Sequence, residues 1–131
     1  MVVDASALVA ILADEPDGPE HEERLLTSED RTIPFSGVFE AVLALSRRKG
    51  RPPEEMQTLV SAYLRTGQIE IAALGEAETV LAIEAHARFG KGRHPARLNM
   101  GDCFAYACAK ARGAPLLYKG DDFVLTDVER A

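Results

Sequence analysis

This sequence has few cysteines and no long apolar run, and each of these absences excludes a class of protein. The 131 residues include two cysteines, Cys103 and Cys108, which lie on different faces of one predicted helix and so cannot readily pair with each other. Two cysteines alone do not make a metal cage, and we expect both to be buried as small apolar residues. No apolar run is long enough to cross a bilayer and there is no signal peptide, so we expect a cytoplasmic protein without membrane contact.

Common catalytic motifs are missing too. The sequence has no phosphate loop of the form Gly-x-x-x-x-Gly-Lys-Ser/Thr. Its three histidines, His21, His86 and His94, lack the spacing of metal ligands, and we expect the first two on the surface. Ser6 and Ser36 lack the context of a nucleophile elbow and are better explained as helix caps. These absences argue against a phosphate-loop nucleotide site, a zinc protease and a serine hydrolase.

The composition indicates one domain that spans residues 1–131. The hydrophobic fraction of 47% and the charged fraction of 27% are ordinary for a soluble domain of this length. The net charge is −6, so the surface as a whole does not favour a polyanionic partner.

One stretch reverses this acidic balance. No acid occurs from residue 86 to residue 97, and the Gly and Pro content of its second half predicts a loop. The loop carries Lys91, Arg93, His94 and Arg97 and leads directly into the helix that begins near Asn99. A basic loop in an acidic protein is suited to contact the phosphates of a nucleic acid.

The alternation of short apolar runs with helices of about ten to fifteen residues predicts a fold of the α/β class. Such a fold has a central parallel sheet with helices on both faces, which makes three layers, α/β/α. The expected strands are residues 1–3, 69–71 and 116–118, and residues 31–34 are expected to form a short connection or a further strand. The expected helices are residues 6–15, 20–29, 36–49, 53–66, 75–89 and 99–113. In the helix of residues 75–89 we expect Val80, Leu81 and Ile83 to point inward.

Acidic residues follow the strands and begin the helices of this pattern. Asp4 follows the first expected strand, Asp102 falls in the first turn of the last helix, and Asp121 and Asp122 follow the last strand. Because strand C-termini and helix N-termini share one side of a parallel sheet, we expect these carboxylates to gather there. Glu40, near the start of a middle helix, is a further candidate.

Each acid also has a simple structural explanation. Asp102 can cap the helix together with Asn99, and Asp121 and Asp122 can be turn residues. Gathered together, however, ionised carboxylates repel one another unless a cation compensates them, and Mg²⁺ prefers oxygen ligands. A Mg²⁺ site beside a basic loop suggests metal-dependent hydrolysis of a phosphodiester. We expect Ser6 to cap its helix and also to orient Asp4 or a metal-bound water.

At this point the sequence resembles a known family. The resemblance rests on three segments: Met-Val-Val-Asp-Ala-Ser at residues 1–6, Leu-Asn-Met-Gly-Asp-Cys-Phe-Ala-Tyr-Ala at 98–107 and Pro-Leu-Leu-Tyr-Lys-Gly-Asp-Asp-Phe-x-x-Thr-Asp at 115–127. In this order they resemble PIN-domain ribonucleases, and among these the VapC toxins of VapBC toxin–antitoxin pairs. The resemblance implies a Mg²⁺- or Mn²⁺-dependent endoribonuclease that cleaves structured RNA such as tRNA or rRNA. It also implies a homodimer and a VapB-like antitoxin that covers the active site.

Carried over residue by residue, the resemblance assigns roles to the acids. Asp4 and Asp102 match the principal metal ligands of the family, and Glu40 matches its middle-helix acid. The fourth acid is Asp122, which we prefer, or Asp121. Thr126 matches the threonine of the family's last motif, and the resemblance implies a structural or supporting role for it.

Two other functions stay open from the residues. A phosphotransfer domain also places an Asp after its first strand, but the phosphatase signature needs a second Asp where this chain has Ser6. A receiver domain needs an Asp after a middle strand, where this chain has Ala72. A non-catalytic binding module with an acidic pocket is the second alternative, and the apolar stripe from Met56 to Leu64 belongs either to its dimer interface or to the core.

Overall fold

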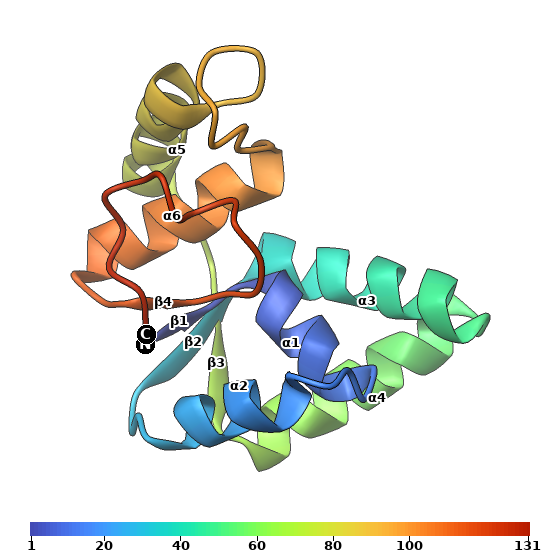
Figure 1. Ribbon diagram of the computed structural model, residues 1–131. Coiled ribbons are helices and arrows are strands. Elements are labelled where there is room, and N and C mark those ends of the chain that lie inside the picture. The colour runs from blue at the N-terminus through green and yellow to red at the C-terminus, as the bar shows by residue number, and fades with distance from the viewer.

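A four-stranded parallel sheet organises the protein, and the computed structural model describes all of residues 1–131 (Figure 1). The strands are β1 (Val2–Val3), β2 (Arg31–Pro34), β3 (Ile69–Ala72) and β4 (Leu116–Leu117). Their order is β3-β2-β1-β4, with every neighbouring pair parallel. The chain leaves β1 toward β2 on one side, and β4 joins β1 on the other. The order therefore switches between β1 and β4, and in parallel sheets ligands bind beyond the strand C-termini at such a point.

Six helices cover the two faces of this sheet. They are α1 (Ala5–Leu12), α2 (Gly18–Leu26), α3 (Phe35–Lys49), α4 (Pro53–Thr66), α5 (Glu76–Phe89) and α6 (Met100–Arg112). Figure 1 shows α5 and α6 on one side of the sheet and α1 to α4 on the other. The alternation of strand side chains feeds both cores, because Val2 packs with α5 and α6 whereas Val3 packs with α1, α3 and α4. The predicted three-layer α/β fold is confirmed. None of the helices combines the length and apolar character that a membrane span requires.

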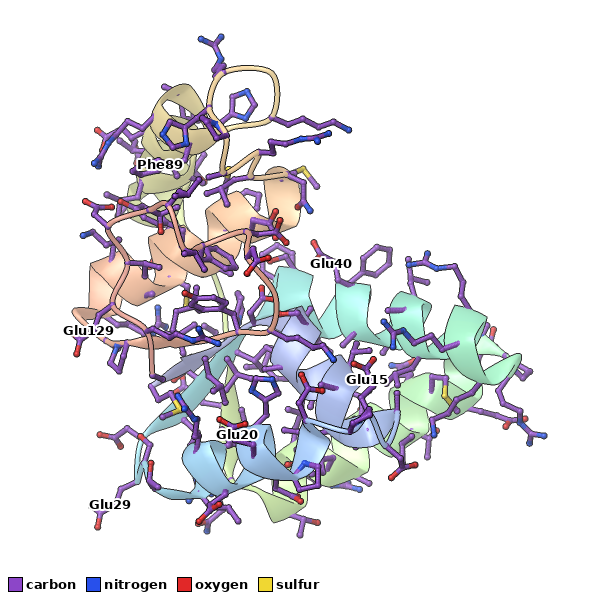
Figure 2. All side chains as sticks on the ribbon, viewed as in Figure 1. Glu15, Glu20, Glu29, Glu40, Phe89 and Glu129 are labelled. Carbon is purple, nitrogen blue, oxygen red and sulfur yellow. The ribbon has the colours of Figure 1, made fainter.

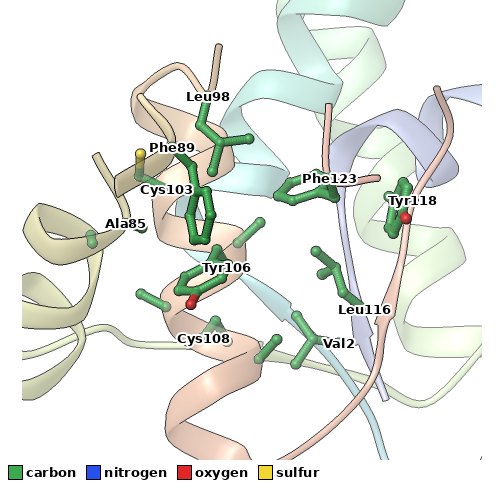
Figure 3. Close-up of a cluster of buried hydrophobic side chains, with 14 of the residues drawn as sticks. Val2, Ala85, Phe89, Leu98, Cys103, Tyr106, Cys108, Leu116, Tyr118 and Phe123 are labelled. Atoms are coloured by element: carbon green, nitrogen blue, oxygen red, sulfur yellow. The ribbon is translucent and has the colours of Figure 1, made fainter. Parts of the chain in front are cut away.

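The core beside α6 anchors the segment after β4. Phe89 and Tyr106 pack with their ring centroids 5.9 Å apart, and Tyr118 packs against Phe123 at 4.9 Å (Figure 3). Phe123 is only 2% exposed. Because a buried aromatic ring fixes its own backbone, the acidic residues just before Phe123 are held at the end of β4.

The face of α5 differs from the prediction. Of the three apolar residues expected to point inward, Leu81 packs against the core, but Val80 and Ile83 are 51% and 65% exposed. The buried face instead presents Ala82 and Ala85 to the core that α5 shares with α6. Small side chains let two helix backbones approach closely, and here this packing outweighs side-chain hydrophobicity.

The predicted starts of two helices were also wrong. Asp4, not Ser6, is the N-cap of α1. Helix α3 begins at Phe35 directly after Pro34, the last residue of β2, so Ser36 lies inside its first turn and its hydroxyl has no hydrogen-bond partner. Strand and helix follow each other here without a connecting loop, which leaves no position for a separate cap.

Three further side-chain predictions are settled by burial. His21 was expected on the surface but is 7% exposed, because α2 turns it inward one turn before the buried Leu25. Met56, Val60 and Leu64 of the apolar stripe of α4 are buried in the core, whereas Leu59 is 37% exposed, so most of the stripe serves the core. Cys103 and Cys108 are both buried, as predicted.

Candidate active site

Asp4 stands at the C-terminal end of β1 and caps α1. Its Oδ2 accepts hydrogen bonds from the Ser6 backbone N–H at 2.9 Å and from the Ser6 hydroxyl at 2.5 Å. The Ser6 hydroxyl oxygen accepts in turn from the backbone N–H of Lys119 at 3.0 Å. Ser6 therefore orients Asp4, which is one of its expected roles, and ties the end of β1 to Lys119, two residues after β4.

Asp102 occupies the first turn of α6, where it forms a reciprocal cap with Asn99. Its Oδ2 accepts from the Asn99 N–H at 2.8 Å, and its own N–H donates to Asn99 Oδ1 at 3.1 Å. The capping explanation of Asp102 is thus confirmed as geometry. It does not exclude a role in the site, because the capped carboxyl also lines the cavity that Asp4 lines.

Glu40 reaches this cavity from α3 by lying against the start of α6 (Figure 2). A Cβ added to Gly101 would lie 1.6 Å from Glu40 Oε1. Only glycine at position 101 therefore leaves room for the carboxylate beside Asp102. The sequence analysis missed Gly101, although a glycine inside the first turn of a helix is a local signal of close approach.

The two acids after β4 lie in different surroundings. Asp122 lines a cavity of about 600 Å³ together with Asp4, Glu40 and Asp102, whereas Asp121 does not. Both line a second cavity of about 350 Å³ beside the basic loop. The position of Asp122 supports the preference for it over Asp121 as the fourth acid.

The acids affect one another electrostatically. Burial, a loss of solvation that disfavours the ionised form, raises the pKa of Asp102 to about 7, and the charges of Asp4, Asp122 and Glu40 add to the shift. Burial also raises the pKa of Asp4, with a contribution from the charge of Asp122, and burial followed by the charge of Asp4 raises the pKa of Glu40. The four carboxyls therefore form one coupled cluster.

This cluster fits a hard divalent cation. No group of three acidic, histidine or cysteine side chains is arranged to hold a metal ion by itself. Mg²⁺, however, is usually held by one or two carboxylates and keeps several waters, and the 600 Å³ cavity has room for them. The space that Gly101 leaves for Glu40, together with a donor set made of oxygen alone, matches that mode of binding.

A family model matches nearly the whole chain. The model of the PIN domain matches residues 1–129. The chain belongs to the PIN domain family. It is 42% identical to Ribonuclease VapC of Mycolicibacterium smegmatis over 98% of this chain and 97% of that protein. It is 39% identical to Ribonuclease VapC30 of Mycobacterium tuberculosis over 98% and 95%, respectively.

A solved structure agrees with the PIN fold. The crystal structure of Mycobacterium tuberculosis VapC20, described as a toxin that cleaves the sarcin-ricin loop, superposes with a TM-score of 0.77. The match covers 99% of this chain and 97% of that one at 14% sequence identity. At this identity the likeness concerns the fold alone.

The cavity that the four acids line also has a basic wall, which the sequence analysis missed. This wall consists of three cations, Arg47, Arg48 and Lys119, which line the cavity together with Glu15. Glu15 forms ion pairs with both Arg48 and Lys119. A local signal existed for Lys119, which follows the β4 segment at the edge where ligands bind, whereas the two arginines look like ordinary cations of a helix C-terminus.

The predicted basic loop lines a different cavity from the basic wall. Lys91, Arg93 and Arg97 are exposed, and Lys91 and Arg97 line the 350 Å³ cavity that the two acids after β4 also line. His94 is turned partly inward, with its ring 5.3 Å from that of Phe89. Its Nδ1 accepts the Ala96 backbone N–H at 3.1 Å, so His94 shapes the loop.

Thr126 closes the turn after the acidic residues. Its hydroxyl donates to the Phe123 carbonyl at 2.8 Å and accepts from the Val128 N–H at 3.3 Å. Of its two expected roles, these contacts fit the structural one.

Proposed function

We propose that this PIN domain is a metal-dependent endoribonuclease, the toxin of a VapBC-type pair, which hydrolyses phosphodiester bonds in structured RNA such as tRNA or rRNA. The observation that carries the proposal is the cluster of four coupled carboxyls around one cavity at the switch point of the sheet. Relatives that match this chain over nearly their whole length are named ribonucleases, which supports the same chemistry.

In this proposal the acids hold Mg²⁺ or Mn²⁺. Asp4 and Asp102 are the principal ligands, and Glu40 and Asp122 complete the set directly or through water. When bound, such a cation lowers the pKa of an attacking water and offsets the charge that develops on the phosphodiester.

The remaining residues prepare the acids for this task. Ser6 and Asn99 hold Asp4 and Asp102 by hydrogen bonds of 2.5 Å and 2.8 Å. With a pKa of about 7, Asp102 is ionised and ready to bind a cation only above neutral pH unless the cation itself displaces the proton. The exposed cations of the loop hold the flanking phosphates of the RNA.

The partners of the proposal are a VapB-like antitoxin and a second copy of the chain. Four apolar side chains near the site are each more than half exposed, namely Phe35, Phe39, Ile83 and Met100. Exposed apolar surface marks sites of protein–protein contact, so it supports both partners. The oligomeric state is tested by light scattering of the purified protein, where we expect the mass of a dimer. A mass of one chain at all concentrations would contradict this part of the proposal.

The test of the catalytic role is cleavage of total cellular RNA by the purified protein with Mg²⁺ or Mn²⁺. We expect discrete fragments that disappear with EDTA and with Asp102→Asn or Asp122→Asn. Asp121→Asn is the matched control, one residue from Asp122 but outside the main cavity, and it should keep most of the activity. Full activity in Asp102→Asn, or in EDTA, would overturn the proposal and favour a binding module.

A further inference from the structure

The basic wall is attached to the catalytic acids on two sides. The backbone N–H of Lys119 is one hydroxyl away from Asp4, through the Ser6 oxygen at 3.0 Å. Arg47 follows Glu40 by seven residues, which places it on the same face of α3 two turns further along. Arg48 is the next residue, and all three cations line the cavity of the acids.

Glu15 holds this wall together. It is the residue where the chain turns after α1, and its side chain is only 13% exposed. It pairs with Arg48 on α3 and with Lys119 after β4, which is 104 residues away in the chain. Asp17 adds a second acceptor for Lys119 at 2.7 Å, and this bond lowers the pKa of Asp17.

The arrangement matches what a phosphate group needs. A guanidinium binds a carboxylate or a phosphate in the same forked geometry, so Glu15 occupies the place that a phosphate would take on Arg48. The Arg48 side chain is 54% exposed, and Arg47 has no ion-pair partner. Both arginines line the cavity, so both are open to a ligand. Eight residues of helix between Glu40 and Arg48 correspond to about 12 Å, which suits a neighbouring phosphate and not the reacting one.

The wall also completes a path. Residues of the basic loop line one cavity with Asp121 and Asp122, and Arg47, Arg48 and Lys119 line the cavity that Asp122 shares with the other three acids. Because Asp122 lines both cavities, an RNA strand that runs through the two of them meets cations in each.

We propose that Arg47, Arg48 and Lys119 bind the RNA backbone beside the bond that is cleaved, and that Glu15 is the internal anion that occupies Arg48 and Lys119 until RNA displaces it. This inference rests on the proposed function. The alternative is that the ion pairs only stabilise the fold, since cations are favoured at the C-terminus of any helix.

The experiment measures binding of a labelled, random-sequence 20-nucleotide RNA by fluorescence anisotropy with Mg²⁺, in an Asp102→Asn background. Arg48→Gln and Lys119→Met are compared with Arg65→Gln, which removes an exposed cation at the end of α4, away from the cavity. We expect each wall variant to weaken binding about threefold to tenfold at low salt, and to reduce the salt dependence by about 0.7 per lost contact. Arg65→Gln should change neither. Equal affinity and equal salt dependence in all three variants would overturn the inference.

The variant Glu15→Gln should change RNA affinity in the opposite direction. Removing the internal anion frees both cations, so RNA binding should tighten severalfold even though the melting temperature falls. Asp17→Asn removes the more exposed partner of Lys119 and should act in the same direction, which keeps the test valid if Glu15→Gln does not fold. Weaker binding in a folded Glu15→Gln or Asp17→Asn variant would contradict the role of the internal anion.

The two proposals fail in different ways. If the parent protein cleaves no RNA with either metal, the nuclease proposal is wrong whatever the binding data show. If the parent cleaves RNA while the wall variants bind as it does, only the basic wall is wrong.

Discussion

Asp102 carries two opposed demands. As the partner of Asn99 at the start of α6 it is favoured in its ionised form, by a hydrogen bond and by the helix dipole. Burial and the charges of Asp4, Asp122 and Glu40 disfavour that form and raise the pKa to about 7. Without a cation the second set of effects wins, so the site stores unfavourable charge at neutral pH.

Asp102→Asn should therefore stabilise the metal-free protein in a pH-dependent way. The folded pKa lies above the ordinary value of 3.8, so the unfolded chain loses its proton first as pH rises, and the folded state loses stability between about pH 4 and pH 7. Asn keeps an acceptor for the Asn99 N–H and has no charge. In EDTA we expect a gain of about 1 to 3 kcal/mol at pH 8 and almost none at pH 4.

Urea unfolding at the two pH values measures this difference. Asp121→Asn, at an exposed residue, is the control and should leave stability unchanged at both. A gain for Asp102→Asn that is equal at pH 4 and pH 8 would show that its charge is not the cause.

Gly101 tests the placement of Glu40. In Gly101→Ala the new Cβ collides with Glu40 Oε1, the far end of a flexible side chain, so the carboxylate moves while the fold survives. We expect RNA cleavage to fall at least about tenfold, because a displaced group loses most of its effect. Gly75→Ala is the control, since its nearest contact would be an ordinary 3.7 Å. Equal activity of both variants, measured by initial cleavage rates, would place Glu40 outside the site.

At the scale of the elements, the turn after β4 depends on one aromatic anchor. Phe123→Ala removes a ring that is 2% exposed and packs against Tyr118. We expect a loss of about 3 kcal/mol in the free energy of unfolding, and a larger loss of cleavage than stability alone explains, because Asp122 is freed.

Val124→Ala is the matched change in the next residue, which is 54% exposed. It should alter stability by less than about 0.5 kcal/mol and leave cleavage intact. Denaturant unfolding and cleavage rates at a temperature where both variants are folded separate the two effects. Normal cleavage by folded Phe123→Ala would mean that the turn is held in place by other contacts.

The elements were predictable where local chemistry decides them. The strand of residues 1–3, the capped helix that begins at Asn99 and the acidic turn after residue 118 follow from apolar runs, caps and turn residues, and the α/β pattern then brought Asp4 and Asp102 to one edge. The face of α5 was not predictable in this way, because close packing of alanines against α6 outweighed the greater hydrophobicity of Val80 and Ile83.

Contacts between distant parts of the chain were not predictable either. Glu15 and Lys119 are 104 residues apart, and no periodicity links them. Glu40 could be placed in the site only by resemblance, because nothing in its own helix shows that Gly101 leaves room for it.

At the scale of the whole molecule, the negative net charge coexists with two local basic surfaces. The chain carries a net charge of −6, yet the cations of the loop and of the basic wall flank the acidic cavity. An acidic protein with two local basic surfaces should bind random RNA weakly and depend on the shape of its target. A cation in the cavity reduces the repulsion between the acids and the RNA backbone and completes this arrangement.

The central claim is that the four acids form one cation site, and titration calorimetry of Mn²⁺ into the metal-free protein at pH 8 tests it most directly. Above the pKa of Asp102 its carboxylate is free to bind. We predict that Asp102→Asn and Asp122→Asn each lose at least about tenfold in Mn²⁺ affinity, whereas Asp121→Asn binds as the parent protein does. Equal Mn²⁺ affinity in the parent and all three variants would contradict the account.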